Sequence, residues 1–127
     1  MLTLNNVAQA YGNKAVLRDI GFHLEPGQIG CLLGPSGCGK TTALRLVAGF
    51  ETLQAGEIRI GADRVGAPGF SMPPEKRQVG LVFQDYALFP HLSVADNIGF
   101  GLRALERAAR EKRVGDMLRL VGLTREA

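Results

Sequence analysis

A glycine-rich segment at residues 34–42 has the composition and spacing of a phosphate-binding loop. Its sequence, Gly-Pro-Ser-Gly-Cys-Gly-Lys-Thr-Thr, matches the pattern G-x-x-x-x-G-K-S/T. Glycines let successive backbone N–H groups converge on an anion. A helix that begins near Lys40 would direct the positive end of its dipole at the same point. The segment therefore predicts a nucleoside triphosphate site, and the competing interpretation is a glycine-rich turn with an exposed lysine.

The polar side chains of this loop have separate expected roles. Lys40 is expected to reach the β- and γ-phosphates, and the Thr41 hydroxyl is expected to bind Mg²⁺. Ser36 and Thr42 can add phosphate contacts. The candidate nucleotide-binding residues of the loop are Gly34, Pro35, Ser36, Gly37, Cys38, Gly39, Lys40, Thr41 and Thr42.

Two residues outside the loop are further candidates, and their patterns leave alternatives open. Gln84 directly follows the apolar run 79–83, and open α/β sheets bind ligands where a buried strand ends. Its side chain could bind Mg²⁺, orient the attacking water or simply end the strand. Tyr11 is expected in a turn after the first strand, where it could stack on an adenine ring or pack against a hairpin.

Apolar patterning predicts the elements that position these residues. Weak alternation from Leu2, a turn at Gly12-Asn13 and an alternating stretch from Val16 to Leu24 predict an antiparallel hairpin. The continuous apolar runs 29–33 and 79–83 predict strands buried on both faces. The apolar spacing over residues 43–50 predicts a helix directly after the glycine loop.

The second half of the chain changes from strand to helix patterning. Residues 57–60 predict another strand, and residues 66–75, which contain three prolines and two glycines, predict a loop. Ser93 with Asp96 three residues later resembles a capping box at a helix start. Apolar residues from Leu105 to Val121 are spaced as one face of a helix, which Gly122 would end.

Composition and charge exclude several classes of protein. The chain has 127 residues, 46% hydrophobic and 21% charged, which excludes a disordered protein. Its longest uncharged stretch, 26–39, is too short and too rich in glycine for a membrane span. The formal net charge of +3 lies within residues 103–127, which contain no aromatic residue, so we expect no nucleic-acid surface. Two cysteines are too few for a disulfide framework and fit a cytosolic protein.

The residues assembled so far resemble the nucleotide-binding subunits of ABC transporters. The resemblance is carried by the glycine loop, by Ala48–Glu51 and by the long stretch Pro73–Val94. Within this family, the resemblance is most specific to the bacterial importers of iron(III), polyamines, sulfate and sugars. It implies an α/β fold, a P-loop NTPase of ABC type. Within that fold it implies an N-terminal antiparallel β region (1–28), a P-loop core through the Q-loop (29–92) and the start of a helical subdomain (93–127).

The same resemblance implies roles for individual residues. Tyr11 resembles the family's adenine-stacking aromatic residue. Gln84 resembles its Q-loop glutamine, which contacts the Mg²⁺ of MgATP and acts in catalysis together with Lys40. The resemblance also implies integral membrane permease subunits as partners, and the residues expected to contact them are Tyr86, Phe89, Pro90 and His91.

The resemblance further implies an assembly and a location. A second ATP-binding subunit would complete a homodimer, and a periplasmic binding protein would act on it indirectly. The protein would lie in the cytoplasm, peripheral to the inner membrane, and iron(III) is favoured slightly among the transported solutes.

The chain also departs from the family pattern. It contains no LSGGQ-like signature, no Walker B carboxylate pair and no switch histidine. We therefore expect an incomplete sheet, and we expect these 127 residues alone to be an inactive, truncated form that does not hydrolyse ATP. The alternatives are a non-transport ABC ATPase, which the stretch 73–94 disfavours, and a small-molecule kinase, which would usually begin with its P-loop strand.

Overall fold

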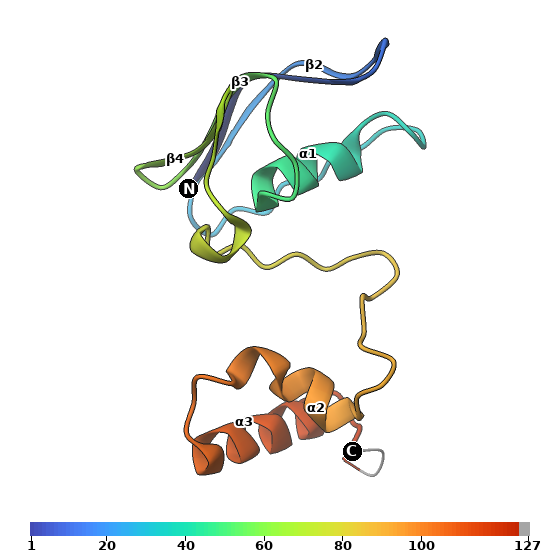
Figure 1. Ribbon diagram of the computed structural model, residues 1–127, viewed down its shortest axis with the longest axis vertical. Helices are drawn as coiled ribbons and strands as arrows, with labels where there is room; N and C mark the ends of the chain where they lie inside the picture. Colours follow the sequence, from blue (N-terminus) through green and yellow to red (C-terminus); the bar gives the residue numbers. More distant parts are fainter. Residues whose placement is uncertain (125–127) are drawn as a thin grey trace. The chain divides into compact units, whose positions relative to one another are not determined.

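The computed structural model describes residues 1–124 and divides the chain into two compact units (Figure 1). The first unit is Met1–Leu81 and the second is Val82–Ala127. The first contains the sheet, the glycine loop and the helix that follows it. The second contains the helices of the C-terminal region. Each unit is described by itself.

The first unit is built on an open antiparallel sheet of five strands in the order β2-β1-β3-β4-β5. The strands are β1 (Leu2–Tyr11), β2 (Lys14–Leu24), β3 (Ala55–Ile60), β4 (Asp63–Ala67) and β5 (Phe70–Ser71). The expected hairpin with its turn at Gly12-Asn13 is confirmed by the pairing of Tyr11 with Lys14. Tyr11 is thus the last residue of β1, and its expected position in the turn was wrong.

An irregularity in β1 explains why the alternation of its sequence is weak. Leu4 pairs with Phe22 and Val7 pairs with Ile20, with a register shift between the two pairs. Leu4 and Val7 are both buried although they are three residues apart. A regular strand would place them on opposite faces. One extra residue lies in β1 between these pairs, and Asn6 there has a positive φ of 48°. The strand therefore bulges and keeps both apolar side chains in the core.

The short strands β4 and β5 lie partly in a region that was expected to be a loop. Ala67 pairs with Phe70 across the dipeptide Pro68-Gly69, and Gly69 has a φ of 74°. Proline followed by glycine at the centre of a tight turn favours this geometry, because glycine adopts positive φ without strain. The turn residues were interpreted as a break in structure, whereas they form a small hairpin.

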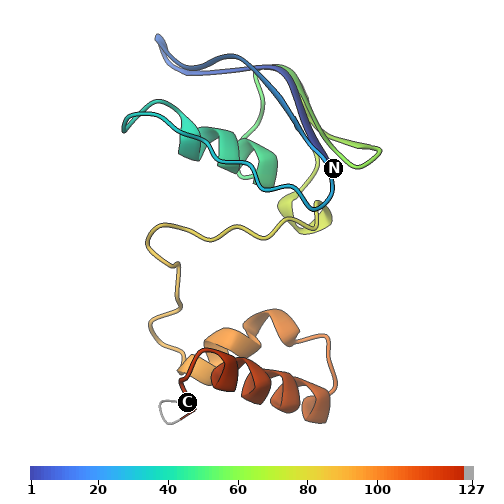
Figure 2. The same cartoon turned by 180° about the vertical axis from the view of Figure 1, so that it is seen from behind.

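Helix α1 (Lys40–Ala48) covers one face of this sheet (Figures 1 and 2). Its expected position after the glycine loop is confirmed. Buried side chains of the helix, of the strands and of the connection between α1 and β3 form one core, whose members are Leu4, Val7, Leu17, Ala43, Leu46, Leu53, Ile58 and Val65. Apolar packing between α1 and the sheet therefore determines where the N-terminal end of the helix lies.

The buried guanidinium of Arg77 fixes the other end of α1. Its side chain is 4% exposed. Nη1 donates to the carbonyls of Leu46 and Val47 at 2.7 and 3.0 Å. Nε donates to the Met72 carbonyl at 2.7 Å and Nη2 to Ser71 Oγ at 2.8 Å. Burial lowers the pKa of Arg77. Its charge lies at the negative end of the helix dipole, so Arg77 ties α1 to the segment after β5.

The strands expected at 29–33 and 79–83 are not formed, and that prediction was wrong for this structure. Neither segment pairs with a strand among residues 1–124. The residues Ile29, Leu33 and Val82 are 98%, 87% and 88% exposed. A strand needs a hydrogen-bonding neighbour, and apolar composition alone does not supply one. The sheet is consequently open, as the sequence led us to expect.

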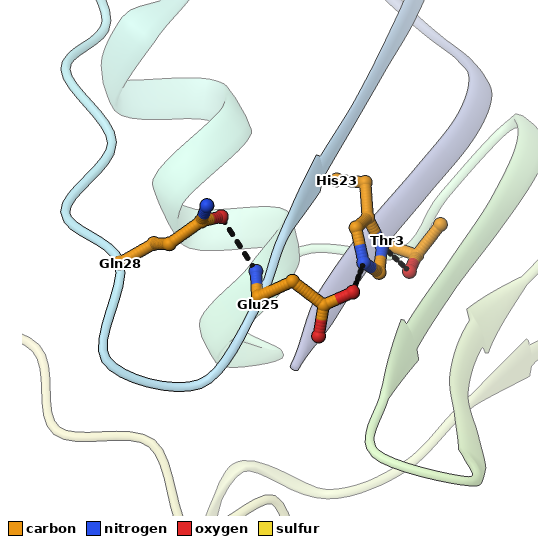
Figure 3. A network of polar contacts seen from close by, with 4 residues as sticks. All are labelled: Thr3, His23, Glu25 and Gln28. Carbon is orange, nitrogen blue, oxygen red and sulfur yellow. Dashed lines mark hydrogen bonds and ion pairs between the residues drawn. The ribbon is translucent and has the colours of Figure 1, made fainter.

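A polar network holds the turn that leads into the segment before the glycine loop (Figure 3). His23 on β2 contacts the Thr3 hydroxyl on β1 through Nδ1 at 2.8 Å and Glu25 through Nε2 at 2.7 Å. The backbone N–H of Glu25 donates to Gln28 Oε1 at 2.8 Å. His23 is exposed, and its side chain joins both strands to the turn at residues 25–28.

The second unit consists of α2 (Val94–Gly99), a 3-10 turn (Phe100–Leu102) and α3 (Arg107–Leu120). Ser93 caps α2, because its Oγ accepts from the backbone N–H of Asp96 at 3.1 Å, as the sequence indicated. Gly122 ends α3 with a φ of 75°. Its expected capping role is confirmed by the bond from the N–H of Leu123 to the carbonyl of Leu118. Within residues 1–124, no helix is long and apolar enough to cross a membrane.

Replacement of Arg77 should destabilise the first unit. We expect Arg77→Met to lower the free energy of unfolding by about 2–4 kcal/mol, because it leaves buried carbonyls without donors. The stability of Arg77→Lys should lie between those of the unsubstituted chain and Arg77→Met, since a lysine keeps the charge and cannot reproduce the guanidinium fork. Urea denaturation measures the effect. The exposed Arg18 of β2 is the control, with an expected change for Arg18→Met below about 0.5 kcal/mol. Equal losses for Arg77→Met and Arg18→Met would contradict the assignment.

Candidate nucleotide site

The glycine loop ends where its backbone approaches β2 most closely. Gly39 is buried, precedes α1 as its N-cap and has a φ of 99°. A Cβ atom at Gly39 would lie 2.6 Å from Leu17 Cδ2 and 2.8 Å from the carbonyl oxygen of Val16. No side chain larger than hydrogen fits there. The loop therefore contacts the same hairpin that carries Tyr11.

The N-terminal end of α1 is open to an anion. No side chain among the described residues caps it, and its first turn holds no acidic residue. The first N–H groups of an α-helix have no partner within the helix. The N–H of Ala43 makes the first helical bond, to the carbonyl of Gly39 at 2.9 Å. Uncapped N–H groups and the helix dipole together suit a phosphate group.

The ammonium group of Lys40 lies over the loop. Its Nζ donates to the carbonyls of Gly34 and Pro35 at 2.7 and 2.8 Å. It also lies 3.5 Å from Cys38 Sγ. These contacts hold the lysine at the concave side of the loop, beside the helix N-terminus. An ammonium placed among uncapped N–H groups makes a positively charged cradle that fits a polyphosphate.

The donor set around Thr41 suits Mg²⁺ only in part. Thr41 is exposed in the first turn of α1 and offers one hydroxyl oxygen. Within residues 1–124, no three His, Cys, Asp or Glu side chains gather as a metal site. Mg²⁺ usually keeps several waters and binds substrate phosphates with few protein ligands. The hydroxyl therefore fits a magnesium ion that arrives with a nucleotide.

Tyr11 lies against the same helix. Its hydroxyl donates to Glu51 Oε2, and 49% of the residue is exposed. The Glu51 carboxylate, as hydrogen-bond acceptor, raises the pKa of Tyr11, and burial adds to the rise. A side-chain hydrogen bond with Thr42 lowers the pKa of Tyr11 and offsets part of this rise. The structure thus brings Tyr11 beside the first turn of α1, which carries Lys40, Thr41 and Thr42.

Gln84 and the residues expected to contact a partner belong to the second unit. The glycine loop and Tyr11 belong to the first, so the geometry described above is that of the first unit alone. Gln84 is exposed in a turn. Tyr86 and Ala87 in the same turn have positive φ values of 60° and 50°. Tyr86 is 78% exposed, whereas the Phe89 ring stacks on Phe100 with ring centroids 4.3 Å apart.

An apolar groove of about 630 Å³ lies within the second unit. Its walls come from the segment before α2, from α2 itself and from the end of α3. They are lined by Leu88, Phe89, Pro90, Leu92, Val94, Asn97, Ile98, Met117, Val121 and Leu123. Two of the expected partner-contact residues, Phe89 and Pro90, thus line this groove. The groove does not include Tyr86 or His91.

A protein-family comparison decides the classification. The model described as "ABC transporter" matches residues 17–127. The chain belongs to the ABC transporter family. The expected α/β fold, a P-loop NTPase of ABC type with N-terminal antiparallel strands, is confirmed by solved structures of this family. A dimeric bacterial ABC transporter cassette matches with a TM-score of 0.82 at 25% identity, over 98% of this chain and 59% of that one. The same cassette in a post-hydrolysis state, bound to ADP and phosphate, matches with a TM-score of 0.81 at 26% identity.

Curated relatives in this family are import ATP-binding proteins. The Fe(3+) ions import ATP-binding protein FbpC 2 of Pectobacterium atrosepticum is 46% identical over 97% of this chain and 35% of its own length. The spermidine/putrescine import ATP-binding protein PotA of Bacteroides thetaiotaomicron is 45% identical over 98% of this chain and 26% of its own length. The chain therefore spans about a third or less of these relatives.

Sequence reasoning missed two residues, Glu51 and Arg77, that hold Tyr11 and helix α1 in place. Glu51 was noted only as part of the segment Ala48–Glu51, and Arg77 only as part of Pro73–Val94. Their roles depend on contacts with Tyr11 and with the carbonyls of α1, which are distant in sequence. No local sequence pattern distinguishes them, since Arg77 lies in the polar run Glu75–Gln78.

Two glycines of the loop should respond differently to alanine. Both have positive φ, so Gly37→Ala and Gly39→Ala each carry a strain of about 1–2 kcal/mol. Only a Cβ at Gly39 meets β2, since nothing lies within 4 Å of one at Gly37. Overpacking should add about 1–3 kcal/mol to the destabilisation by Gly39→Ala. Urea denaturation of the two variants gives the comparison, and equal destabilisation would refute the close approach of Gly39 to β2.

Proposed function

We propose that this chain is the nucleotide-binding part of an ABC import ATPase that binds MgATP and, in the whole protein, hydrolyses it to drive solute uptake. One observation carries the proposal. The uncapped start of α1, the loop that reaches β2 at Gly39 and the Lys40 ammonium converge on one place. That arrangement suits the polyphosphate of a nucleotide.

The residues of the loop would divide the work of holding ATP. Backbone N–H groups over Gly34–Thr42 would hold the β-phosphate, and Lys40 would leave the Gly34 and Pro35 carbonyls to bind the terminal phosphates. Ser36 and Thr42 would add hydroxyl contacts, and Cys38 fills space beside Gly34. Tyr11 would stack on adenine through its exposed ring.

Magnesium would be held by Thr41 and by Gln84, the residue that we propose as the link to the attacking water. When bound, Mg²⁺ neutralises charge that develops on the phosphates. Lys40 would stabilise the same charge, so Lys40 and Gln84 are the catalytic candidates in this chain. The proposal for Gln84 rests on its sequence context after the run 79–83 and on its exposed turn.

The proposed partners follow from the importer relatives and from the second unit. Permease subunits in the membrane would contact Tyr86, Phe89, Pro90 and His91, and a second copy would complete a homodimer. A periplasmic binding protein would act indirectly. Exposed Tyr86 and the apolar groove beside it in sequence suit a protein surface. The protein would then lie on the cytoplasmic face of the membrane.

Iron(III) is our first proposal for the transported solute. It is supported by the relative named as an Fe(3+) import protein. Polyamines are the second proposal, supported by the relatives from two Bacteroides species at 45% and 44% identity. Uptake assays with both solutes would distinguish them.

Loss of the Lys40 charge should weaken nucleotide binding. We expect Lys40→Ala to raise the Kd for MgATP roughly tenfold to a hundredfold, the equivalent of one or two charge-assisted hydrogen bonds. Isothermal titration calorimetry measures it. Lys112→Ala is the control, because Lys112 is an exposed lysine of α3 in the second unit. Unchanged affinity in Lys40→Ala, or an equal loss in Lys112→Ala, would refute the proposed site.

The partner surface should be sensitive to loss of its exposed aromatic ring. Tyr86→Ala should lower co-purification with the proposed permease subunits by about fivefold, because exposed tyrosines often contribute a kcal/mol or more to an interface. Leu120→Ala removes an apolar side chain of α3 that is 76% exposed and lies outside the groove lining. It should leave co-purification unchanged. The opposite order of effects would place the contact elsewhere.

A further inference from the structure

Glu51 links the ring of Tyr11 to the helix that follows the phosphate loop. The Tyr11 hydroxyl donates to Oε2 of Glu51. The other oxygen, Oε1, lies 3.7 Å from Nη1 of Arg45 on α1. The carboxylate therefore bridges the end of β1 and the surface of α1.

The Glu51 carboxylate is held in a fixed place. Its side chain is 18% exposed, whereas that of Arg45 is 50% exposed. Just before it, Gly49 ends α1, and the N–H groups of Gly49 and Phe50 both donate to the Arg45 carbonyl at 2.9 Å. The chain thus turns tightly between Arg45 and Glu51. This turn presents Glu51 on the side of the helix that faces Tyr11.

The anchored hydroxyl leaves the ring of Tyr11 accessible. Half of this residue is exposed although its hydroxyl is bonded. A tyrosine on the last residue of a strand would otherwise sample several rotamers, and ordering it upon binding costs free energy. A bond at the far end of the ring removes that freedom in advance. The ring then presents a preorganised face for stacking.

We propose that Glu51 is a positioning residue that orients Tyr11 for stacking on the base of a nucleotide. This inference rests on the proposed function, because it deepens how the same site recognises its ligand. Glu51 would act through Tyr11 alone and would have no part in holding phosphate. Its loss should therefore weaken the binding of a nucleoside triphosphate and leave the binding of inorganic triphosphate intact.

The first test measures the bond without any nucleotide. The chain has no tryptophan and two tyrosines, so in a Tyr86→Phe background the absorbance of phenolate reports Tyr11 alone. Because the carboxylate raises the pKa of Tyr11, Glu51→Ala should move the titration midpoint to lower pH. Glu57→Ala is the matched control, since Glu57 pairs with Arg59 at 3.4 Å on β3. Equal midpoints for the Glu51→Ala and unsubstituted backgrounds would overturn the proposal.

The second test separates base recognition from phosphate binding. By calorimetry, Glu51→Ala should weaken MgATP about fivefold, as expected for one hydrogen bond of a partly exposed pair. Inorganic triphosphate with Mg²⁺ should bind within about twofold of the unsubstituted chain. Glu51→Gln keeps an acceptor oxygen and should restore most of the MgATP affinity. In a Tyr11→Phe background, Glu51→Ala should cause no further loss.

The outcomes distinguish a failure of the proposed nucleotide site from a failure of the positioning role of Glu51. If the unsubstituted chain binds neither MgATP nor triphosphate, the proposed function fails, and the tyrosine titration still decides whether Glu51 holds Tyr11. If both ligands bind and Glu51→Ala weakens both equally, or if its effect persists in the Tyr11→Phe background, then the positioning role is overturned while the nucleotide site stands.

Discussion

The close approach of the Gly39 backbone to β2 is the constraint on which the rest of the first unit depends. Because Val16 and Leu17 leave no room for a side chain at this point, α1 begins at a fixed place on the face of the sheet. The loop before it must then curve away from the sheet, and Lys40 spans its concave side. The hairpin that receives Gly39 also carries Tyr11, so phosphate and base recognition share one support.

The two ends of α1 are held by different kinds of interaction. Apolar packing and a close backbone contact fix its start, whereas Arg77 and Glu51 fix its end through polar bonds. Neither charge is placed at the uncapped N-terminus, where a negative side chain would compete with phosphate. The helix is thus rigid where it meets the protein and electrostatically open where it would meet a ligand.

The sequence predicted well those features that local chemistry determines. The hairpin turn, the glycine loop, the helix after it, the Ser93 cap and the Gly122 end all depend on residues within one turn of each other. The runs 29–33 and 79–83 were predicted wrongly because a strand exists only with a neighbour. The supporting residues Glu51 and Arg77 escaped prediction because the contacts that give them their roles join distant parts of the chain: Tyr11 is 40 positions from Glu51, and Leu46 is 31 positions from Arg77.

The unpaired apolar segment 29–33 has a consequence for the behaviour of these 127 residues in solution. Ile29 and Leu33 expose nearly their whole side chains, and the backbone of this segment joins no ladder within residues 1–124. An exposed, uncharged and apolar segment without a strand neighbour is a template for cross-β pairing between molecules. Self-association through this segment would rise with protein concentration. Its onset would set the highest concentration at which these residues stay monomeric.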